Sequence, residues 1–426
     1  MTLRRNFVYS LTGSTLYGGC QWLLLVVIAK LRDPESVGAF ALALAVTAPI
    51  SLFLDLRLRA LEATDATEQF AFHDYLGLRV ITASLSLCTC ALVSLFPAHR
   101  EHAQLILAVA LFKCFESISD VLYGLMQKHE RMDLIALSLS LKGIGPLLVV
   151  TLLLKAGASL VTAALSIAAV WACLLLIVDL HNTRFLLRRS GSLFWPSSNI
   201  RSLLHSSRRL ARLALPLGVV AVVSSLYITV PRYVIQGYLG SKQLGYFAAV
   251  SYLTVVMARV VVALGEAVLP RLGQLYVSRG PGFTRLLARF GGLVLSVTLG
   301  AVGASALLGR EFLTLLYRPE YAPYSGLLVW VMAASAVDCV GYSIGHGLVV
   351  ARYLKTHMLI ALATAISTTC GCLFLVPAVG LRGAAWGLGI GALVQLVGSV
   401  YASLRVTRTR GVADRVECAE LCPERP

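Results

Sequence analysis

The chain has 426 residues, of which 58% are hydrophobic and only 14% are charged, and its mean hydropathy is +0.79. A soluble protein of this length could not cover its surface with so few charges, so the composition indicates an integral membrane protein. The net charge of +16 would also suit a nucleic-acid-binding protein, but the positions of the charges, described below, argue against that function.

The chain begins with Arg4 and Arg5 followed by an apolar run, which is a pattern shared with signal peptides. The run continues to about Ile28 without a small-x-small cleavage site, and further apolar segments follow. The sequence therefore predicts an uncleaved first transmembrane helix.

Apolar segments of about 20 residues, the length that an α-helix needs to cross a bilayer, recur along the chain. The first six are 8–29, 38–56, 76–96, 105–125, 134–154 and 159–180, and the second six are 213–236, 244–266, 286–309, 325–350, 357–377 and 382–404. The predicted fold is an all-α membrane protein with about twelve transmembrane helices in two six-helix lobes. The predicted parts are an N-terminal lobe at 1–180, a basic linker at 181–212, a C-terminal lobe at 213–404 and a tail at 405–426.

Lys and Arg are concentrated in alternate loops, on the side of the N-terminus. By the positive-inside rule this side is the cytoplasm, so both termini are predicted to be cytoplasmic. The basic charge is then explained by topology, and nucleic acid is not an expected partner. The segment RFLLRRSGSLFWPSSNIRSLLHSSRRLARL (184–213) mixes Arg with Leu, Phe and Trp. It is interpreted as an interfacial linker, or alternatively as a contact site for anionic lipid or a cytoplasmic partner.

The two predicted lobes share a short pattern near the start of their second helix. Gly38, Phe40 and Ala41 follow a polar turn in the first lobe, and Gly245, Phe247 and Ala248 do so in the second. Such a match at corresponding positions favours a two-lobe repeat of the kind that transporters use.

Three ionisable residues lie in the apolar stretch LFKCFESISDVLYG (111–124): Lys113, Glu116 and Asp120. At helical spacing they form one polar stripe. A charge near the bilayer centre costs at least about 2.5–3.5 kcal/mol, so it normally faces a cavity or a partner. Lys142, at similar depth on the next helix, is the predicted partner, beside an aqueous cavity. A purely structural ion-pair cluster stays open as an alternative.

The second lobe has its own intramembrane charges. Arg259 and Glu266 share a helix face, and Asp338 lies near the middle of its helix, where a functional or buried-pair role is favoured. Arg232 and Glu266 could instead extend to the interface, and His346 is interpreted as a packing residue. In the first lobe, Asp55 and Asp179 are interpreted as ordinary charges at helix ends.

Two further features bear on chemistry. The C-x-C pairs Cys88/Cys90 and Cys370/Cys372 have no nearby His or carboxylate partners in the sequence, so no metal site is expected. Prolines lie inside predicted spans, where they either permit bending between transport states or form simple kinks. They are Pro49, Pro146, Pro216, Pro231 and Pro377.

Longer motifs resemble the bacterial polysaccharide flippases (Wzx-type oligosaccharide exporters) of the multidrug/oligosaccharidyl-lipid/polysaccharide (MOP) exporter superfamily, which has a MATE-like fold. The matching stretches are DLRLRALEATDATEQFAFHDYLGLRVIT (55–82), FESISDVLYGLMQKHERMDLIALSLSLKGI (115–144), VPRYVIQGYLGSKQLGYFAAVSYL (230–253), LPRLGQLY (269–276), LLYRPEYA (315–322) and LRGAAWG (381–387). The residues that match the family pattern are Arg59, Asp65, Arg79, Lys113, Glu116, Asp120, Arg131, Asp133, Lys142, Arg232 and Tyr233.

The resemblance implies a flippase of the bacterial cytoplasmic membrane, which moves undecaprenyl-pyrophosphate-linked oligosaccharide for surface polysaccharide synthesis by alternating access. Polysaccharide polymerases or assembly proteins are then expected partners, beside membrane lipid. The sodium site of drug-exporting relatives has no match in this sequence, so the coupling ion, H⁺ or Na⁺, stays open.

A mechanism follows as a hypothesis. Cationic side chains would bind the pyrophosphate through charge-assisted hydrogen bonds, and carboxylates would take up the coupling ion. The cationic candidates are Lys113, Lys142, Arg232, Arg259 and Arg59, and the carboxylate candidates are Glu116, Asp120 and Asp338.

No Walker A motif is present, so ATP drive is not expected, and neither a cofactor nor a catalytic residue is predicted. A MATE-like antiporter of drugs or small cations is the main alternative. A membrane enzyme is disfavoured because the outer loops are short, and a noncatalytic scaffold would leave the intramembrane charges unexplained.

Overall fold

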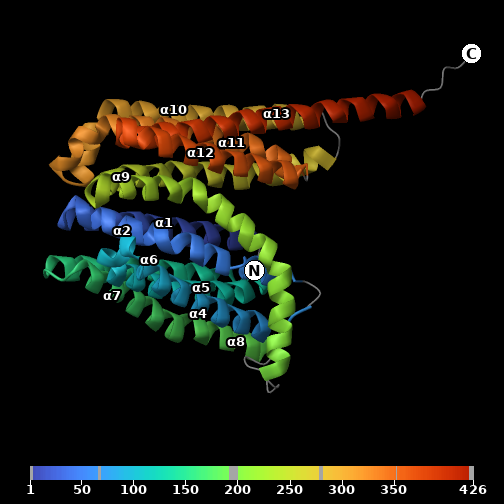
Figure 1. The fold of residues 1–426 in the computed structure, drawn as a ribbon. Coiled ribbons are helices and arrows are strands. Elements are labelled where there is room, and N and C mark those ends of the chain that lie inside the picture. The colour runs from blue at the N-terminus through green and yellow to red at the C-terminus, as the bar shows by residue number, and fades with distance from the viewer. Residues whose placement is uncertain (1–2, 66–68, 191–199, 278–281, 352, 422–426) are drawn as a thin grey trace, which may run out of the picture. The chain divides into compact units, whose positions relative to one another are not determined.

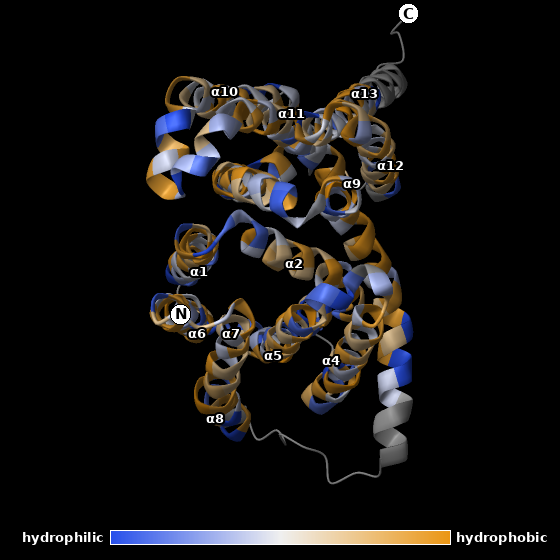
Figure 2. Ribbon diagram, turned by 60° about the vertical axis from the view of Figure 1, so that its left-hand side comes forward, coloured by the Kyte–Doolittle hydropathy of each residue, from blue (hydrophilic) through white to orange (hydrophobic). Residues whose placement is uncertain are grey.

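The computed structural model describes residues 3–65, 69–190, 200–277, 282–351 and 353–421. Every regular element in these ranges is a helix (Figure 1). Ten described segments are long and apolar enough to cross a membrane, and hydrophobic residues predominate along most helices (Figure 2). The prediction of an all-α, multi-pass membrane protein is confirmed. The chain divides into two compact units, Met1–Ala249 and Val250–Pro426, which are described in turn.

The first unit is arranged around α5. Its helices are α1 (Leu3–Leu31), α2 (Pro34–Leu54), α3 (Leu58–Thr64), α4 (Phe72–Ser94), α5 (Ala103–Lys128), α6 (Met132–Lys155), α7 (Leu160–Leu174), α8 (Leu180–Ser190) and the first part of α9 (Ile200–Val277). Short helical turns lie at η1 (Pro97–His102) and η2 (Leu175–Asp179). Helix α5 packs against α2, α3, α4 and α7, while α1 packs against α6. The helix with the predicted polar stripe is therefore surrounded by others.

The seven-residue helix α3 does not appear among the predicted segments. Helix α2 ends at Leu54, and the next residues, Leu56 and Arg57, have φ angles of 50° and 51°. This left-handed conformation is uncommon for residues with a β-carbon, and it turns the chain sharply. The turn directs α3 back against α5, so that Arg59 and Glu62 lie beside the polar stripe.

Pro146 shapes the middle of α6. Proline has no N–H, so the carbonyl of Lys142, four residues earlier, has no helical hydrogen-bond donor. The indole Nε1–H of Trp171 on α7 donates to that carbonyl at 3.1 Å. Farther along the same connection, residues Leu175–Asp179 form a single π-helical turn. Such turns change the direction of side chains within a helix, and this one ends at Asp179.

The repeated Gly-x-Phe-Ala segments pack against each other inside this unit. Gly240, with φ of 82°, interrupts α9 just before the second segment. A β-carbon on Gly38 would collide with the carbonyl oxygen of Ser241, and one on Gly245 would collide with the carbonyl oxygen of Pro34. Because only glycine allows such an approach of two backbones, the two glycines form one reciprocal contact.

The second unit contains the remainder of α9, then α10 (Gly282–Leu316), η3 (Pro319–Tyr324), α11 (Ser325–Val350), α12 (Leu354–Val379) and α13 (Leu381–Leu421). Helix α11 packs against α10 and α13, and α12 packs against α13. The φ angle of 70° at Gly380 makes the turn between α12 and α13.

Most predicted spans coincide with a helix of the structure. The span predicted at 159–180 continues as α7, η2 and α8, and those at 213–236 and 244–266 both lie in α9. The count of twelve and the position of the termini stay predictions. Of the predicted linker at 181–212, residues 191–199 lie outside the described residues, and so do residues 422–426 of the predicted tail.

Candidate functional site

The polar stripe on α5 begins with an ion pair. Lys113 Nζ lies 2.6 Å from Glu116 Oε2, and the two side chains are 28% and 34% exposed. The hydroxyl of Tyr17 on α1 donates to Glu116 Oε1 at 2.8 Å. This pair, called the open pair below, is anchored on one side by α1 and is accessible on another.

A second group of charges lies farther along α5. Arg79 of α4 is completely buried, and its Nη1 lies 2.6 Å from Asp55 Oδ1. Ser117 connects the two, because it accepts from Arg79 and donates to Asp55. Arg59 of α3 lies 3.3 Å from Asp120 and is one-third exposed. The turn after α2 and the helix α3 thus each bring one charge to α5.

A third group, called the closed pair below, is fully buried. Lys142 Nζ lies 2.5 Å from Asp179 Oδ2, and the two side chains are 3% and 0% exposed. Lys142 also donates to Ser119 and to the hydroxyl of Tyr123, while Ser138 donates to Asp179. Both charges therefore have several hydrogen-bond partners, as a buried ion pair requires.

One expectation from the sequence is met in part and another is wrong. Lys142 lies within electrostatic range of Glu116 and Asp120, as expected, but its salt bridge is to Asp179, and Glu116 pairs with Lys113. Asp55 and Asp179 are not ordinary helix-end charges, since each forms a salt bridge with a buried cation. Depth along straight helices predicted the first pairing, but Asp179, which ends the π-helical turn after α7, is the carboxylate that meets Lys142.

Glu62 was missed entirely by sequence reasoning. It is 3% exposed, and neither carboxyl oxygen has a hydrogen-bond partner in the structure. Its position on α3, which the sequence did not predict, left no signal that it would be buried.

Three family-matched charges, Asp65, Arg131 and Asp133, stabilise loops outside the spanning segments. Burial raises the pKa of Asp65, but hydrogen bonds from the backbone N–H groups of Gln69 and Phe70 and from the Tyr75 hydroxyl outweigh it and lower that pKa. Arg131 contacts Asp133 at 2.8 Å across the start of α6, which raises the pKa of the guanidinium. The contacts of Asp65 and of the Arg131–Asp133 pair thus give these charges a structural role in their loops.

The remaining predicted residues have different surroundings. Arg232 is half-buried on α9, beside Tyr233, whose hydroxyl donates to the carbonyl of Ala45 at 2.6 Å. In the second unit Arg259 is exposed, and Asp338 is half-buried with no salt bridge to another described residue. The structure does not bring Arg259 and Asp338 together as an ion pair.

His346 contacts aromatic rings, as expected of a packing residue. Its ring lies edge-to-face with Phe290 and with Tyr342, with centroids 6.0 Å and 4.7 Å away. The side chain of Glu266 lies outside the described residues. No group of three or more His, Cys, Asp or Glu within the described ranges is placed to hold a metal ion.

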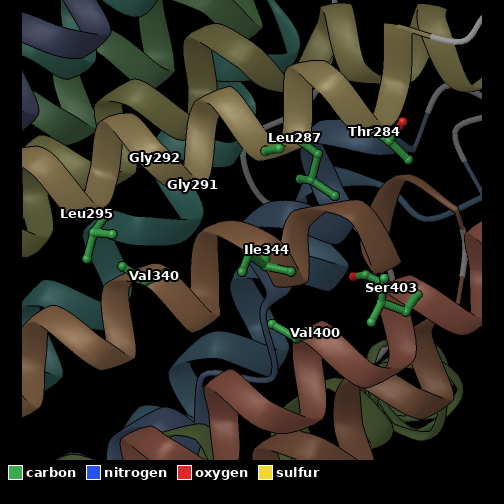
Figure 3. Close-up of a pocket in the computed structure, with 11 residues that line it drawn as sticks. Thr284, Leu287, Gly291, Gly292, Leu295, Val340, Ile344, Val400 and Ser403 are labelled. Atoms are coloured by element: carbon green, nitrogen blue, oxygen red, sulfur yellow. The ribbon is translucent and has the colours of Figure 1, made fainter.

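The second unit has an apolar groove of about 410 Å³ between α10, α11 and α13. Figure 3 shows Thr284 and Ser403 toward one end and Leu295 and Val340 toward the other. Gly291 and Gly292 leave the α10 wall without side chains at its middle. An apolar groove of this kind suits a hydrocarbon chain rather than a polar ligand.

Comparison with known proteins gives a consistent result. A family model described as "Polysaccharide biosynthesis protein" matches residues 3–276. The capsular polysaccharide biosynthesis protein CapF of Staphylococcus aureus is 26% identical over 411 residues, covering 94% of this chain and 99% of CapF.

Solved structures show the same fold at low identity. The lipid II flippase MurJ, in an inward closed conformation, superposes with a TM-score of 0.74 at 13% identity, covering 99% of this chain and 94% of MurJ. An inward-facing multidrug resistance MATE family transporter of the MOP superfamily superposes with a TM-score of 0.65 at 16% identity, covering 96% of each chain.

Proposed function

Because the chain belongs to the polysaccharide biosynthesis protein family, we propose that it is a flippase for lipid-linked oligosaccharide in the bacterial cytoplasmic membrane. Its substrate is an undecaprenyl-pyrophosphate-linked unit destined for O-antigen, capsule or exopolysaccharide. Transporters and flippases with this fold move molecules without chemical conversion, so no catalytic residue is assigned. CapF and MurJ, whose names refer to capsular polysaccharide and to lipid II, support this substrate class.

The observation that carries the proposal is the partial exposure of cations inside an apolar helical bundle. Lys113 and Arg59 are each about one-third exposed, 28% and 33%, and each has a carboxylate partner. A pyrophosphate has several anionic oxygens, and it can replace those carboxylates by accepting charge-assisted hydrogen bonds. Because the cations are already neutralised at rest, they stay stable in the membrane without substrate.

The two ends of the substrate need different environments. The pyrophosphate and sugars need polar groups, which the first unit supplies along α5. The lipid tail needs apolar surroundings, which the bilayer supplies. The sequence contains no Walker A motif, so we expect an ion gradient to drive transport, and polymerase or assembly proteins to receive the product.

The test is deletion of the gene in the native bacterium, followed by assay of both lipid-linked oligosaccharide and finished surface polysaccharide. We expect lipid-linked units to accumulate on the cytoplasmic face while finished polymer disappears, and the wild-type gene to restore both. Unchanged glycans together with altered sensitivity to drugs or dyes would contradict the proposal and indicate a MATE-like antiporter.

A further inference from the structure

Glu62 forms no salt bridge with a described residue, although it lies in a cluster of charges whose other carboxylates do. Around α5 the four cations Arg59, Arg79, Lys113 and Lys142 each contact a carboxylate, and a fifth, Lys128, acts on Glu62 electrostatically without a salt bridge to it. The four carboxylates in those contacts are Asp120, Asp55, Glu116 and Asp179. Glu62 is the fifth carboxylate of the cluster, and it takes part in none of these pairs.

The carboxyl group of Glu62 is packed directly against the backbone of α5. A β-carbon added to Gly124 would overlap Glu62 Oε2, so only glycine at this position leaves room for the carboxyl group. Glu62 is 3% exposed, and neither of its oxygens accepts a hydrogen bond. Water and hydrogen-bond donors are thus both excluded from it.

The charged groups that act on Glu62 come from each neighbouring helix. They are Lys128 and Asp120 of α5 and Arg79 of α4. Arg59 lies three residues earlier on α3 itself. Arg79 donates to Asp55 and Ser117, and Arg59 to Asp120 and Gln127. None of the described hydrogen bonds of these arginines reaches Glu62.

Burying an ionised carboxylate without a donor or a counter-ion costs several kcal/mol, and such a group takes up a proton instead. The surrounding structure also indicates where movement can occur. Helix α3 has only seven residues and is joined to α2 through Leu56 and Arg57, which are both in the strained left-handed conformation. Strain of this kind is concentrated at sites that change conformation.

We propose that Glu62 is a proton-binding site that couples transport to the proton gradient. In this conformation the carboxyl group holds a proton. When substrate draws Arg59 away from Asp120, α3 moves from Gly124, Glu62 becomes hydrated, and its proton passes to water. This coupling role rests on the proposed function, whereas proton binding by Glu62 does not. It moves the coupling role from Glu116 and Asp120, which form salt bridges, to a carboxylate that forms none with a described residue.

The first test is infrared spectroscopy of the full-length protein in lipid vesicles. A protonated carboxyl group has a C=O stretching band that an ionised carboxylate lacks. We expect the wild type to show this band near neutral pH and Glu62→Gln to lose it. The matched control Glu116→Gln should keep the band, because Glu116 is an ionised carboxylate that accepts hydrogen bonds from Lys113 and Tyr17.

If Glu62→Gln does not accumulate in the membrane, Glu62→Asp is the second variant. Its shorter acid side chain should shift the frequency of the band. A band unchanged in the variant would overturn the proposal.

The second test measures coupling, in vesicles from cells that make lipid-linked oligosaccharide. An imposed pH gradient should accelerate glycan translocation by the wild type and have no effect on Glu62→Gln. Equal acceleration of both proteins would overturn the coupling role and leave the flippase proposal intact. If the infrared band depends on Glu62 but the wild type moves no glycan, the proposed function fails and the proton site stands.

Discussion

The open pair and the closed pair have nearly the same chemistry and different surroundings. Their N–O distances are 2.6 Å for Lys113–Glu116 and 2.5 Å for Lys142–Asp179. The closed pair is at most 3% exposed and has hydrogen bonds from or to three hydroxyl groups. The open pair is about one-third exposed, and its hydroxyl bond within the described part of the chain comes from Tyr17.

This difference separates two roles for intramembrane charge. A buried pair has given up its hydration, so loss of one partner leaves an uncompensated charge in an apolar interior. A partly exposed pair keeps some hydration, so each partner can be exchanged for another ion at small cost. We therefore expect the closed pair to act in stability and propose ligand exchange for the open pair. Substrate binding by Lys113 and Lys142 stays a prediction.

The largest expected effect comes from breaking the closed pair. Lys142→Ala should cost about 3–5 kcal/mol of folding free energy, because Asp179 would remain buried without its counter-ion. The amount of protein in the membrane, measured by immunoblot, should fall steeply.

The matched control removes both charges at once. Lys142→Met with Asp179→Leu replaces the pair by apolar side chains of similar size, and such replacements are often neutral or stabilising. We expect the double variant to restore protein abundance. Restored abundance without surface polysaccharide would mean that the pair acts in transport, and it would contradict the assignment of the closed pair to stability.

A smaller effect is expected from Tyr123→Phe. The Tyr123 hydroxyl lies 3.0 Å from Lys142 Nζ and 2.7 Å from Ser138 Oγ, so its removal leaves buried polar groups unsatisfied at a cost of about 1–3 kcal/mol. Tyr17→Phe is the counterpart in the open pair and should cost about 0.5–1.5 kcal/mol. Thermal unfolding in detergent measures both, and the reverse order would contradict the assignment.

The smallest effect on stability, with a large effect on activity, is expected from Lys113→Ala. An ion pair with this exposure contributes about 0–1 kcal/mol, so protein abundance should be nearly unchanged. Surface polysaccharide should nevertheless be lost, because the substrate pyrophosphate would lose a cation. Lys155→Ala, at the exposed end of α6, is the matched control and should keep wild-type polysaccharide. Normal polysaccharide in Lys113→Ala would remove this lysine from the mechanism.

The fold was largely predictable because membrane spans carry a strong composition signal. Apolar segments of spanning length predicted the long helices between α1 and α13, and the spacing of Lys113, Glu116 and Asp120 predicted a polar face on α5. The short helix α3 was not predictable in this way. It has only seven residues, and it follows a turn in which Leu56 and Arg57 are left-handed. Glycine is the residue that usually indicates such a conformation in a sequence, and neither position has one.

The partners within the site were less predictable than its location. Pairing of Lys142 with Asp179 involves a carboxylate at the end of a π-helical turn, and such a turn shifts side chains relative to an ideal helix. Glu62 is buried against Gly124. That glycine is one of many in an apolar sequence, and the residues beside it do not indicate that a carboxyl group packs there. The spacing of residues shows which side chains share a face of one helix. It does not show which other helix that face packs against.

The reciprocal contact of Gly38 and Gly245 has a consequence for how this chain can evolve. The space that a β-carbon on Gly38 would need is filled by the carbonyl oxygen of Ser241, and the space that one on Gly245 would need is filled by the carbonyl oxygen of Pro34. A side chain at either position would therefore push the same two segments apart. Two positions far apart in the sequence are therefore under one structural constraint. A substitution at either glycine disrupts the same contact between the two segments.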